Sequence, residues 1–274
     1  MENGTITYTQ LLREDLGIFR VTPDNGVVPD FKAGQFLTLG LPLESKIVNR
    51  AYSIASSPEN KKFFEFVIRW VRRPLPGRLT SLLFNSKEGD KISWAKPAGN
   101  LTINDTLPNG KKDTRRIICI GGGTGLAPFV SFAQHLHDTN DKREIVVLHG
   151  ASYVDELSYK QLLTDLENES IDKGKDNWNF KYRAAISRPE EWTNRAWNGH
   201  KGRIEQFLRS NDAGKSPLEE LVGEKITKDN TMFYVCGWQG TIDGVMDYLK
   251  AKNFVSERNK REDGSYEVKF ESYG

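Results

Sequence analysis

The sequence contains very little cysteine: Cys119 and Cys236 are the only two among its 274 residues. They lie far apart and match neither a metal-binding nor a CxxC spacing. Most iron–sulfur clusters need four thiolates, so two cysteines exclude an internal cluster of that kind. Isolated cysteines are typical of chains whose thiols stay reduced, and we therefore expect a cytoplasmic protein.

The sequence also lacks repeats, low-complexity tracts and long hydrophobic runs. No apolar run approaches the length of a membrane-spanning segment. Residues 1–5 lack the basic and apolar regions that begin a signal peptide. We therefore expect a globular protein without a membrane segment or a leader.

A large excess of charge of one sign is absent too. The formal net charge is +2, which is too small to indicate a nucleic-acid partner. The four histidines match no metal-ligand spacing, so no metal site is predicted. One local basic stretch remains, made of Lys61, Lys62, Arg69, Arg72, Arg73 and Arg78. It is either a solvated face or a docking face for an acidic redox protein.

The first hundred residues consist of short apolar segments separated by turns. The segments predicted as strands are 6–9, 17–21, 35–39, 63–71 and 91–94, and the predicted helix is 79–85. Such a regular series of strands predicts an antiparallel β-barrel. The following residues, 104–114, are rich in Asn, Asp, Gly, Lys and Pro and predict a linker. We therefore place a first domain at residues 1–108.

In the rest of the chain, strands alternate with helices. The predicted strands are 116–120, 144–149, 180–187, 232–236 and 266–270. The predicted helices are 128–137, 156–163 with Asp155 as N-cap, 204–208 and 241–251. This alternation predicts a parallel sheet with helices on both faces, an α/β nucleotide-binding domain, at residues 109–274.

The tetrad Arg50-Ala51-Tyr52-Ser53 combines a cation, an aromatic ring and a hydroxyl. The planar fork of Arg50 suits a phosphate. Tyr52 lies two residues further along a strand, so it points to the same face, where its ring can pack flat against another ring system. Ser53 adds a small hydroxyl near the edge of that ring. Taken alone, the tetrad also fits a surface arginine on a half-buried strand.

A second segment, Gly77-Arg78-Leu79-Thr80-Ser81, precedes a short apolar stretch. Glycine allows the backbone to come close to a ligand. The amides of a helix N-terminus and the hydroxyls of Thr80 and Ser81 suit a pyrophosphate. The alternative is an ordinary capped helix. The order of tetrad, apolar strand and this segment is what a flavin site on a barrel needs.

The glycine run Gly121-Gly122-Gly123-Thr124-Gly125-Leu126-Ala127-Pro128 follows an apolar strand and precedes a helix. It matches neither the GxGxxG fingerprint nor a P-loop. Its glycines still permit close approach, and the helix N-terminus after them favours an anionic phosphate. Pro128 suits the first turn of that helix. We therefore predict a dinucleotide site here, with a flexible loop as the alternative.

The choice between NAD and NADP depends on residues near the adenosine ribose. The second predicted strand of the α/β part ends at Ala151-Ser152, with no acidic residue until Asp155. Ser187 and Arg188 end the third strand and suit a 2′-phosphate, with Arg203 helping. This pattern favours NADP. The alternative is a pair of exposed arginines without a special role.

Cys236 and Gly237 close another predicted strand. The carboxyl end of a parallel strand faces the ligand crevice in such folds. We interpret Cys236 as a residue that lines the nicotinamide pocket and not as a nucleophile. A buried structural cysteine is the alternative.

In order and spacing, three motifs resemble the ferredoxin–NADP reductase family over almost the whole chain: Arg50–Ser53, Gly121–Pro128 and Val235–Gly237. Three further segments resemble its bacterial branch: Leu157-Ser158-Tyr159, Ser187-Arg188 and Gly202-Arg203-Ile204. The resemblance implies an FAD-binding antiparallel barrel followed by an NADP-binding α/β domain. One departure is Ser152, where related bacterial reductases often carry arginine.

The resemblance also implies roles for single residues. The residues implied to contact FAD are Arg50, Ala51, Tyr52, Ser53, Gly77, Leu79 and Thr80. Those implied to contact NADP are Gly123, Thr124, Gly125, Ser187, Arg188, Arg203 and Gly237. Three residues are implied at the reacting rings: Ser53 near flavin N5, Cys236 beside the nicotinamide, and Tyr273 over the other flavin face. Gly274 follows Tyr273 and shifts its register from the family pattern.

The function implied is a flavoprotein reductase. It would transfer a hydride from NADPH to FAD and single electrons to ferredoxin or flavodoxin, or run in reverse. Within the same class, an NAD(P)H–flavin reductase or an oxygenase-linked reductase component is the alternative. From a different class, the chain would be a flavin-binding electron-transfer or regulatory subunit without NADPH activity, which the glycine run and Ser187-Arg188 argue against.

Overall fold

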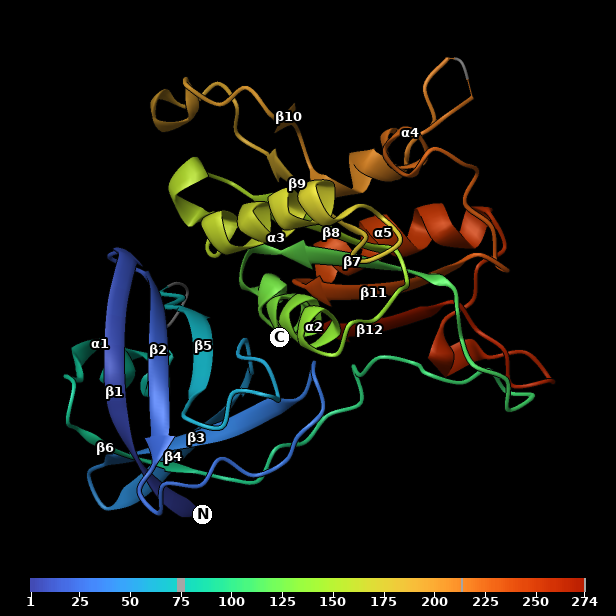
Figure 1. Ribbon diagram of the computed structural model, residues 1–274. Helices are drawn as coiled ribbons and strands as arrows, with labels where there is room; N and C mark the ends of the chain where they lie inside the picture. The colour runs from blue at the N-terminus through green and yellow to red at the C-terminus, as the bar shows by residue number, and fades with distance from the viewer. Residues whose placement is uncertain (73–76, 213, 274) are drawn as a thin grey trace. The chain divides into compact units, whose positions relative to one another are not determined.

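The computed structural model describes residues 1–72, 77–212 and 214–273 (Figure 1). Arg73 of the basic stretch and Gly274 therefore lie outside the described residues. The chain forms two compact units. Unit 1 comprises Met1–Ile103 and Ala127–Thr139, and unit 2 comprises Asn104–Leu126 and the residues from Asn140 onward. In the described parts of the chain, every helix is too short or too polar to cross a membrane.

Unit 1 is built on a six-stranded sheet. Its strands are β1 (Glu2–Arg13), β2 (Leu16–Pro23), β3 (Phe36–Leu43), β4 (Lys46–Ser53), β5 (Phe64–Arg69) and β6 (Lys91–Trp94), and its short helix is α1 (Arg78–Asn85). The strand order is β4-β3-β6-β1-β2-β5, and each neighbouring pair is antiparallel. The predicted antiparallel domain and the short helix predicted at residues 79–85 are confirmed.

Aromatic side chains fill the core of unit 1. Phe19, Phe64 and Trp94 are fully buried, and the ring centroids of Phe64 and Trp94 lie 5.4 Å apart. Leu79 and Leu83 attach α1 to this core. Burying one such side chain contributes about 1.5–3 kcal/mol. Because α1 is fixed in this way, it lies beside β3 and β4.

Helix α2 (Ala127–Asp138) belongs to unit 1, although it follows the glycine run in the sequence. The hydroxyl of Ser131 donates to the carbonyl of Ser56 at 2.8 Å. The side-chain amide of Gln134 donates to the carbonyl of Ala55 at 3.0 Å. The alternation of strands and helices does not reveal this attachment, because these bonds join residues about 80 positions apart.

Unit 2 is built on a parallel sheet. Its strands are β7 (Arg116–Gly122), β8 (Ile145–Ala151), β9 (Phe180–Ile186), β10 (His200–Lys201), β11 (Thr231–Gly237) and β12 (Val268–Ser272). Its helices are α3 (Lys160–Lys173), α4 (Pro217–Val222) and α5 (Gln239–Ala251). Every pairing is parallel and the order is β10-β9-β8-β7-β11-β12, which confirms the predicted α/β domain. The strand order reverses between β7 and β11.

The central strands of unit 2 are buried along nearly their whole length, as expected for a parallel sheet covered on both faces. One face packs against α5 and α4 through a single apolar cluster that includes Ile118, Val146 and Phe233. Helix α3 is also tied to the segment that follows it: the indole nitrogen of Trp178 donates a hydrogen bond to the carbonyl of Leu166 at 2.9 Å. Helix and sheet are therefore locked by packing and by a buried hydrogen bond.

One predicted helix start is wrong. Helix α3 begins at Lys160 and not at residue 156, and Asp155 is not its N-cap. Residues Val154–Glu156 form a short 3₁₀ turn instead. The buried carboxylate of Glu156 accepts a hydrogen bond from the amide of Ser152 at 3.0 Å, which closes the turn and delays the helix.

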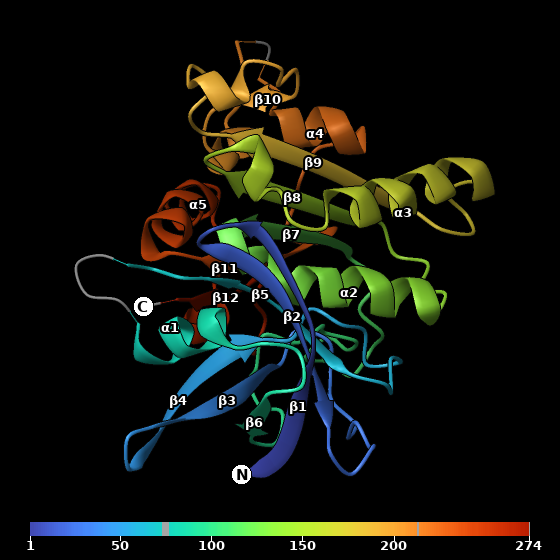
Figure 2. The same ribbon diagram turned by 90° about the vertical axis from the view of Figure 1, so that its left-hand side faces the viewer.

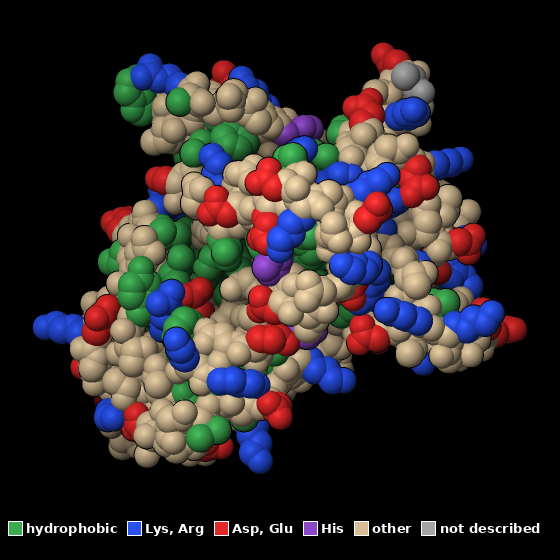
Figure 3. Space-filling model, viewed as in Figure 1, with side chains coloured by type: hydrophobic (Ala, Val, Ile, Leu, Met, Phe, Trp, Pro, Cys, Tyr) green, Lys and Arg blue, Asp and Glu red, His purple; other side chains and the backbone are tan. Residues whose placement is uncertain are grey.

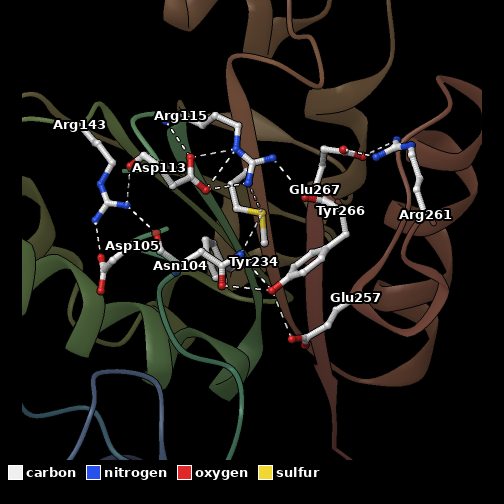
Figure 4. Close-up of polar contacts among 11 residues, drawn as sticks. Asn104, Asp105, Asp113, Arg115, Arg143, Tyr234, Glu257, Arg261, Tyr266 and Glu267 are labelled. Carbon is white, nitrogen blue, oxygen red and sulfur yellow. Dashed lines mark hydrogen bonds and ion pairs between the residues drawn. The ribbon is translucent and has the colours of Figure 1, made fainter. Parts of the chain in front are cut away.

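The predicted linker is held tightly to unit 2 by polar side chains (Figure 4). Arg143 donates to the carbonyl of Asn104 at 2.8 Å, and the amide of Asn104 donates to the hydroxyl of Tyr234 at 2.8 Å. Arg115 pairs with Asp113 at 2.6 Å. A composition rich in polar and turn residues predicts a linker. Here Asn104 and Asp113 of this segment are held in place by hydrogen bonds and an ion pair to side chains of unit 2.

Candidate functional site

In unit 1, the tetrad ends β4, which is an edge strand. Arg50 and Ala51 are exposed, and the guanidinium of Arg50 donates to the carbonyl of Asn49 at 2.8 Å. Tyr52 is half-buried on the same face of the strand as Arg50. Ser53 is buried. The tetrad therefore presents a cation and a ring at the rim of the sheet.

The Gly77–Thr80 segment reaches the same rim, because α1 packs beside β3 and β4 (Figure 2). Gly77 is the N-cap of α1, and neither a side-chain cap nor an acidic residue occupies the first turn. A side chain at position 77 would meet the hydroxyl of Thr80 at 2.7 Å. The structure thus brings the tetrad and the predicted pyrophosphate segment together. An arginine beside an uncapped helix N-terminus suits a phosphate.

Burial raises the pKa of Tyr52, while the Thr80 side chain and the charge of Arg50 have smaller opposite effects. The phenol is therefore neutral at physiological pH. A neutral, half-buried ring offers a suitable surface on which a flat aromatic ligand can stack.

In unit 2, the glycine run and Cys236 meet where the strand order reverses. Gly121 of β7 pairs in register with Cys236 of β11. In open α/β sheets, ligands bind outside the carboxyl ends of the strands at such a switch point. The two segments singled out in the sequence are therefore parts of one candidate dinucleotide site.

The glycine run is a packed turn and not a flexible loop. Gly123–Leu126 form a 3₁₀ turn in which Thr124 is half-buried and Gly123 has a φ of +56°. A Cβ at Gly125 would lie 2.2 Å from the carbonyl oxygen of Cys236. Glycine is therefore required at 125 because two backbones touch there. The predicted close approach of this run to a ligand stays a prediction.

The thiol of Cys236 is buried beside the end of the chain. Burial raises its pKa above the ordinary range, with a smaller opposite effect from the Tyr273 side chain. A thiol kept protonated is a poor nucleophile, in agreement with its interpretation as a pocket residue. The amide of Tyr273 donates to the carbonyl of Gly237 at 3.0 Å, which carries the chain terminus along β11.

Glu271 is a residue that the sequence analysis missed. It pairs in register with Cys236, and burial raises its pKa. A carboxyl group at the edge of the candidate site adds a group that can hold a proton there. The sequence analysis missed Glu271 because the predicted last strand stops at residue 270, whereas the observed strand, β12, reaches residue 272.

The residues predicted to bind a 2′-phosphate lie just after the ends of two neighbouring strands. Ser187 and Arg188 are exposed after β9, and Arg203 is exposed after β10. The amide of Gly202 donates to the carbonyl of Ile186 at 2.8 Å, so the two segments emerge side by side. The structure thus brings the predicted residues to one edge of unit 2.

Both arginines already have polar partners. Arg188 donates to the hydroxyl of Tyr153 at 2.8 Å, and its guanidinium lies over the Tyr153 ring. The Nε atom of Arg203 lies 2.7 Å from a carboxylate oxygen of Glu205. Tyr153 is thus a further candidate ligand residue. The sequence offered no separate signal for it.

His149 is a further titratable residue of unit 2. His149 is fully buried, and burial lowers its pKa to about 4; its Nδ1 lies 3.3 Å from the hydroxyl of Tyr182. Within the described ranges, no three His, Cys, Asp or Glu side chains are grouped to hold a metal ion.

Three of the five described residues of the basic stretch on unit 1 are paired with acidic residues. Its ion pairs are Lys61–Asp30 at 2.9 Å, Arg69–Asp15 at 2.9 Å and Arg72–Glu14 at 3.3 Å. Arg72 also lies over the ring of Trp70. On the visible face of the molecule, basic and acidic side chains are interspersed (Figure 3). The stretch is therefore less positive than its sequence indicates.

Comparison with known families identifies both halves of the chain. Residues 4–103 match the model described as an oxidoreductase FAD-binding domain. Residues 119–247 match the model described as an oxidoreductase NAD-binding domain. The two matches correspond to the tetrad side and the glycine-run side of the sequence.

The chain is 26% identical to a flavodoxin/ferredoxin–NADP reductase of Buchnera aphidicola, over 88% of each protein. It is 38% identical to a ferredoxin–NADP reductase of Azotobacter vinelandii, over 49% of each. It is also 32% identical to one component of the Na⁺-translocating NADH-quinone reductase of Marinomonas, over 69% of this chain and 42% of that one.

Among solved structures, the fold is similar to that of a ferredoxin–NADP⁺ reductase from Neisseria gonorrhoeae with bound FAD and NADP. The TM-score is 0.77 at 21% identity, over 98% of this chain and 97% of that one. At this level of identity the likeness concerns the fold.

Proposed function

The chain belongs to the ferredoxin–NADP reductase family of flavoproteins, and we propose that it oxidises NADPH and delivers electrons singly to a ferredoxin or flavodoxin. When bound, FAD would supply the redox chemistry, since a flavin can accept a hydride and release electrons one at a time. The protein residues bind and orient the two nucleotides. We further propose that the FAD part spans residues 1–108, the NADP part residues 109–274, and that the protein works in the cytoplasm.

In unit 1, we assign Arg50 to an FAD phosphate and Tyr52 to one face of the flavin ring. Ala51 lies between them in the sequence, and its small side chain would leave room for the cofactor. Ser53 is assigned to the redox edge of the flavin, where its hydroxyl can donate a hydrogen bond. The residues assigned to the pyrophosphate are Gly77, Leu79 and Thr80, with Leu79 acting through the position of α1.

In unit 2, we assign the turn of Gly123, Thr124 and Gly125 to the dinucleotide. Cys236 and Gly237 would hold the nicotinamide, with the neutral thiol as a small, uncharged wall. The residues assigned to the 2′-phosphate are Ser187, Arg188 and Arg203. Tyr273 is assigned to the face of the flavin opposite Tyr52. Nothing in this assignment needs a general base, since a hydride leaves the nicotinamide directly.

One observation supports this function above the others. The strand order of unit 2 reverses between β7 and β11, where the glycine turn and Cys236 meet. Unit 1 separately offers an exposed arginine on β4, a strand that packs against α1, and the N-terminus of α1 is uncapped. A chain with both sites has the parts for electron transfer between two nucleotides, whereas a flavin-binding protein without NADPH activity has no use for the second.

The test is a series of three absorbance measurements on the purified protein under anaerobic conditions. The protein should be yellow, and NADPH should bleach it faster than NADH. Addition of an oxidised ferredoxin or flavodoxin should then restore the colour. A colourless protein that fails to bind added FAD would overturn the proposal, and failure only in the last step would point to a flavin reductase.

A second candidate is an NADH-dependent reductase. The observation that favours it is the carboxylate of Glu205, which lies 2.7 Å from Arg203 and would repel a 2′-phosphate. Ser152, in place of an arginine, acts in the same direction. Equal bleaching rates with NADH and NADPH would support this candidate.

A further inference from the structure

Asn194 is a buried polar residue on an otherwise exposed segment. Its relative exposure is 1%, whereas its neighbours Thr193 and Arg195 are exposed. It ends the short 3₁₀ turn Trp192–Asn194 in the connection between β9 and β10. A buried amide side chain is costly unless it is hydrogen-bonded, so its partners explain its position.

The side chain of Asn194 joins two loops. Its Oδ1 accepts a hydrogen bond from the amide of Val154 at 2.9 Å. Its Nδ2 donates to the carbonyl of Ser152 at 3.0 Å and to the carbonyl of Arg188 at 2.7 Å. The first two partners follow β8 and the third follows β9. One side chain therefore fixes the distance between the carboxyl ends of two strands.

Both loops carry side chains that face the proposed 2′-phosphate site. Tyr153 stands between the two partners of Asn194 on the first loop, and Arg188 stands on the second. The guanidinium of Arg188 donates to the hydroxyl of Tyr153 at 2.8 Å. The amide of Ser187 also donates to the carbonyl of Ala151 at 2.9 Å. The backbone below the Tyr153–Arg188 pair is thus held at several points.

We propose that Asn194 is a positioning residue that sets the preference for a 2′-phosphorylated dinucleotide. It holds the Tyr153 and Arg188 loops in register, so that the phosphate meets a guanidinium already in place. This inference rests on the proposed use of NADPH. Without Asn194, both loops would have to be ordered when the coenzyme binds, and binding would weaken by that cost.

The test compares Asn194→Ala with Asn230→Ala in the intact flavoprotein. Asn230 is a matched control because its side chain also makes three bonds: it accepts from Thr227 at 2.9 Å and Thr231 at 2.8 Å and donates to Lys225 at 3.0 Å. These partners lie at the amino end of β11, away from the proposed phosphate site. The measurements are kcat and KM with NADPH and with NADH, using ferricyanide as acceptor, and the Kd of 2′,5′-ADP.

We expect Asn194→Ala to raise the KM for NADPH and the Kd of 2′,5′-ADP about tenfold. Both kcat and the KM for NADH should change little. Asn230→Ala should leave the ratio of the two coenzymes as in the wild type. An unchanged ratio in Asn194→Ala would overturn the proposal, and so would an equal loss with both coenzymes, since that is the effect of a merely structural residue.

Asn194→Asp is the second variant, and it keeps the shape of the side chain. The new carboxylate can still accept a hydrogen bond from the amide of Val154. Its second oxygen, however, cannot donate to the carbonyls of Ser152 and Arg188 as the amide nitrogen did. We therefore expect the same loss of preference for NADPH over NADH. The coenzyme preference of the wild type distinguishes a failure of the proposed use of NADPH from a failure of the role of Asn194. A wild type without a preference for NADPH refutes the coenzyme assignment and this inference with it. A wild-type preference that both variants retain refutes the role of Asn194 alone.

Discussion

The two units present their candidate site residues in opposite ways. In unit 1, the tetrad lies on β4, an edge strand along which most residues are exposed. In unit 2, the glycine turn and Cys236 lie at the ends of β7 and β11, whose residues are almost all buried. The first site consists of side chains on a rim. The second is formed by the shape of the backbone.

This difference determines what a substitution does. A side chain on an exposed edge can be removed with little effect on stability, so its loss is a loss of binding. A glycine pressed against a neighbouring strand cannot gain a side chain without moving the backbone. We therefore expect substitutions in the glycine turn of unit 2 to affect folding and binding together, and substitution of an exposed tetrad residue such as Arg50 to affect binding alone.

The largest effect is expected for Gly125→Ala. The new Cβ would lie 2.2 Å from the carbonyl oxygen of Cys236, an atom of the buried strand β11 that cannot turn away. We expect the free energy of unfolding to fall by about 4 kcal/mol or more, as measured by urea denaturation. Gly240→Ala is the control, since its nearest atom is the end of the Arg203 side chain at 3.7 Å. Equal stability of both variants would remove the contrast between the units.

The next effect comes from His149, which is buried in unit 2. Its pKa is about 4 in the folded protein and 6.5 for an ordinary histidine. Between these values the unfolded chain binds a proton that the folded chain does not, so stability falls as the pH falls through this window. The difference corresponds to about 3 kcal/mol.

Urea denaturation of the wild type and His149→Gln at pH 8, 6.5, 5 and 4 checks this value. The gap in stability between the two proteins should change in favour of the variant as the pH falls. A gap that is constant over the whole range would show that His149 is readily protonated, and that the sheet around it is less closed than its burial indicates.

Arg50→Ala tests the opposite side of the comparison. Arg50 is exposed, and a hydrogen bond to a charged group is worth about 1.5–3 kcal/mol. We therefore expect FAD to bind about 10- to 100-fold more weakly, measured by flavin fluorescence on release. The stability of the FAD-free protein should change by less than about 0.5 kcal/mol. Lys46→Ala, on the same strand, should change neither quantity.

The same contrast explains which features were readable from the sequence. Strand β6 was predicted at its observed bounds, Lys91–Trp94, because a turn precedes a clear apolar alternation. The tetrad and the glycine run were found because they are local runs of residues with defined chemistry. Their meeting points, α1 beside β4 and Gly121 beside Cys236, were not predicted, because they depend on elements that only the fold brings together.

Features that depend on distant partners were missed. The start of α3 was misplaced because Glu156 turns its carboxylate back to Ser152 and closes a 3₁₀ turn. Asn194 and Glu271 carried no local signal, since each depends on a neighbouring strand or loop brought close by the fold. The attachment of α2 to unit 1 belongs to the same class. A sequence shows what a residue is, whereas these features depend on what it faces.

The smallest effect is expected for charge reversal on the basic stretch. If this stretch docks an acidic ferredoxin, Arg72→Glu should slow its reduction at low salt while leaving reduction of ferricyanide unchanged. The effect should be only about two- to fivefold, because rim charges act mainly on the association rate and Arg72 already pairs with Glu14 at 3.3 Å. Arg209→Glu, an exposed cation of unit 2, is the control. If both reversals slow the partner equally, the interaction is with net charge and not with unit 1. If neither does, the basic residues form a solvated face, and the rim of unit 1 contributes only its cofactor site.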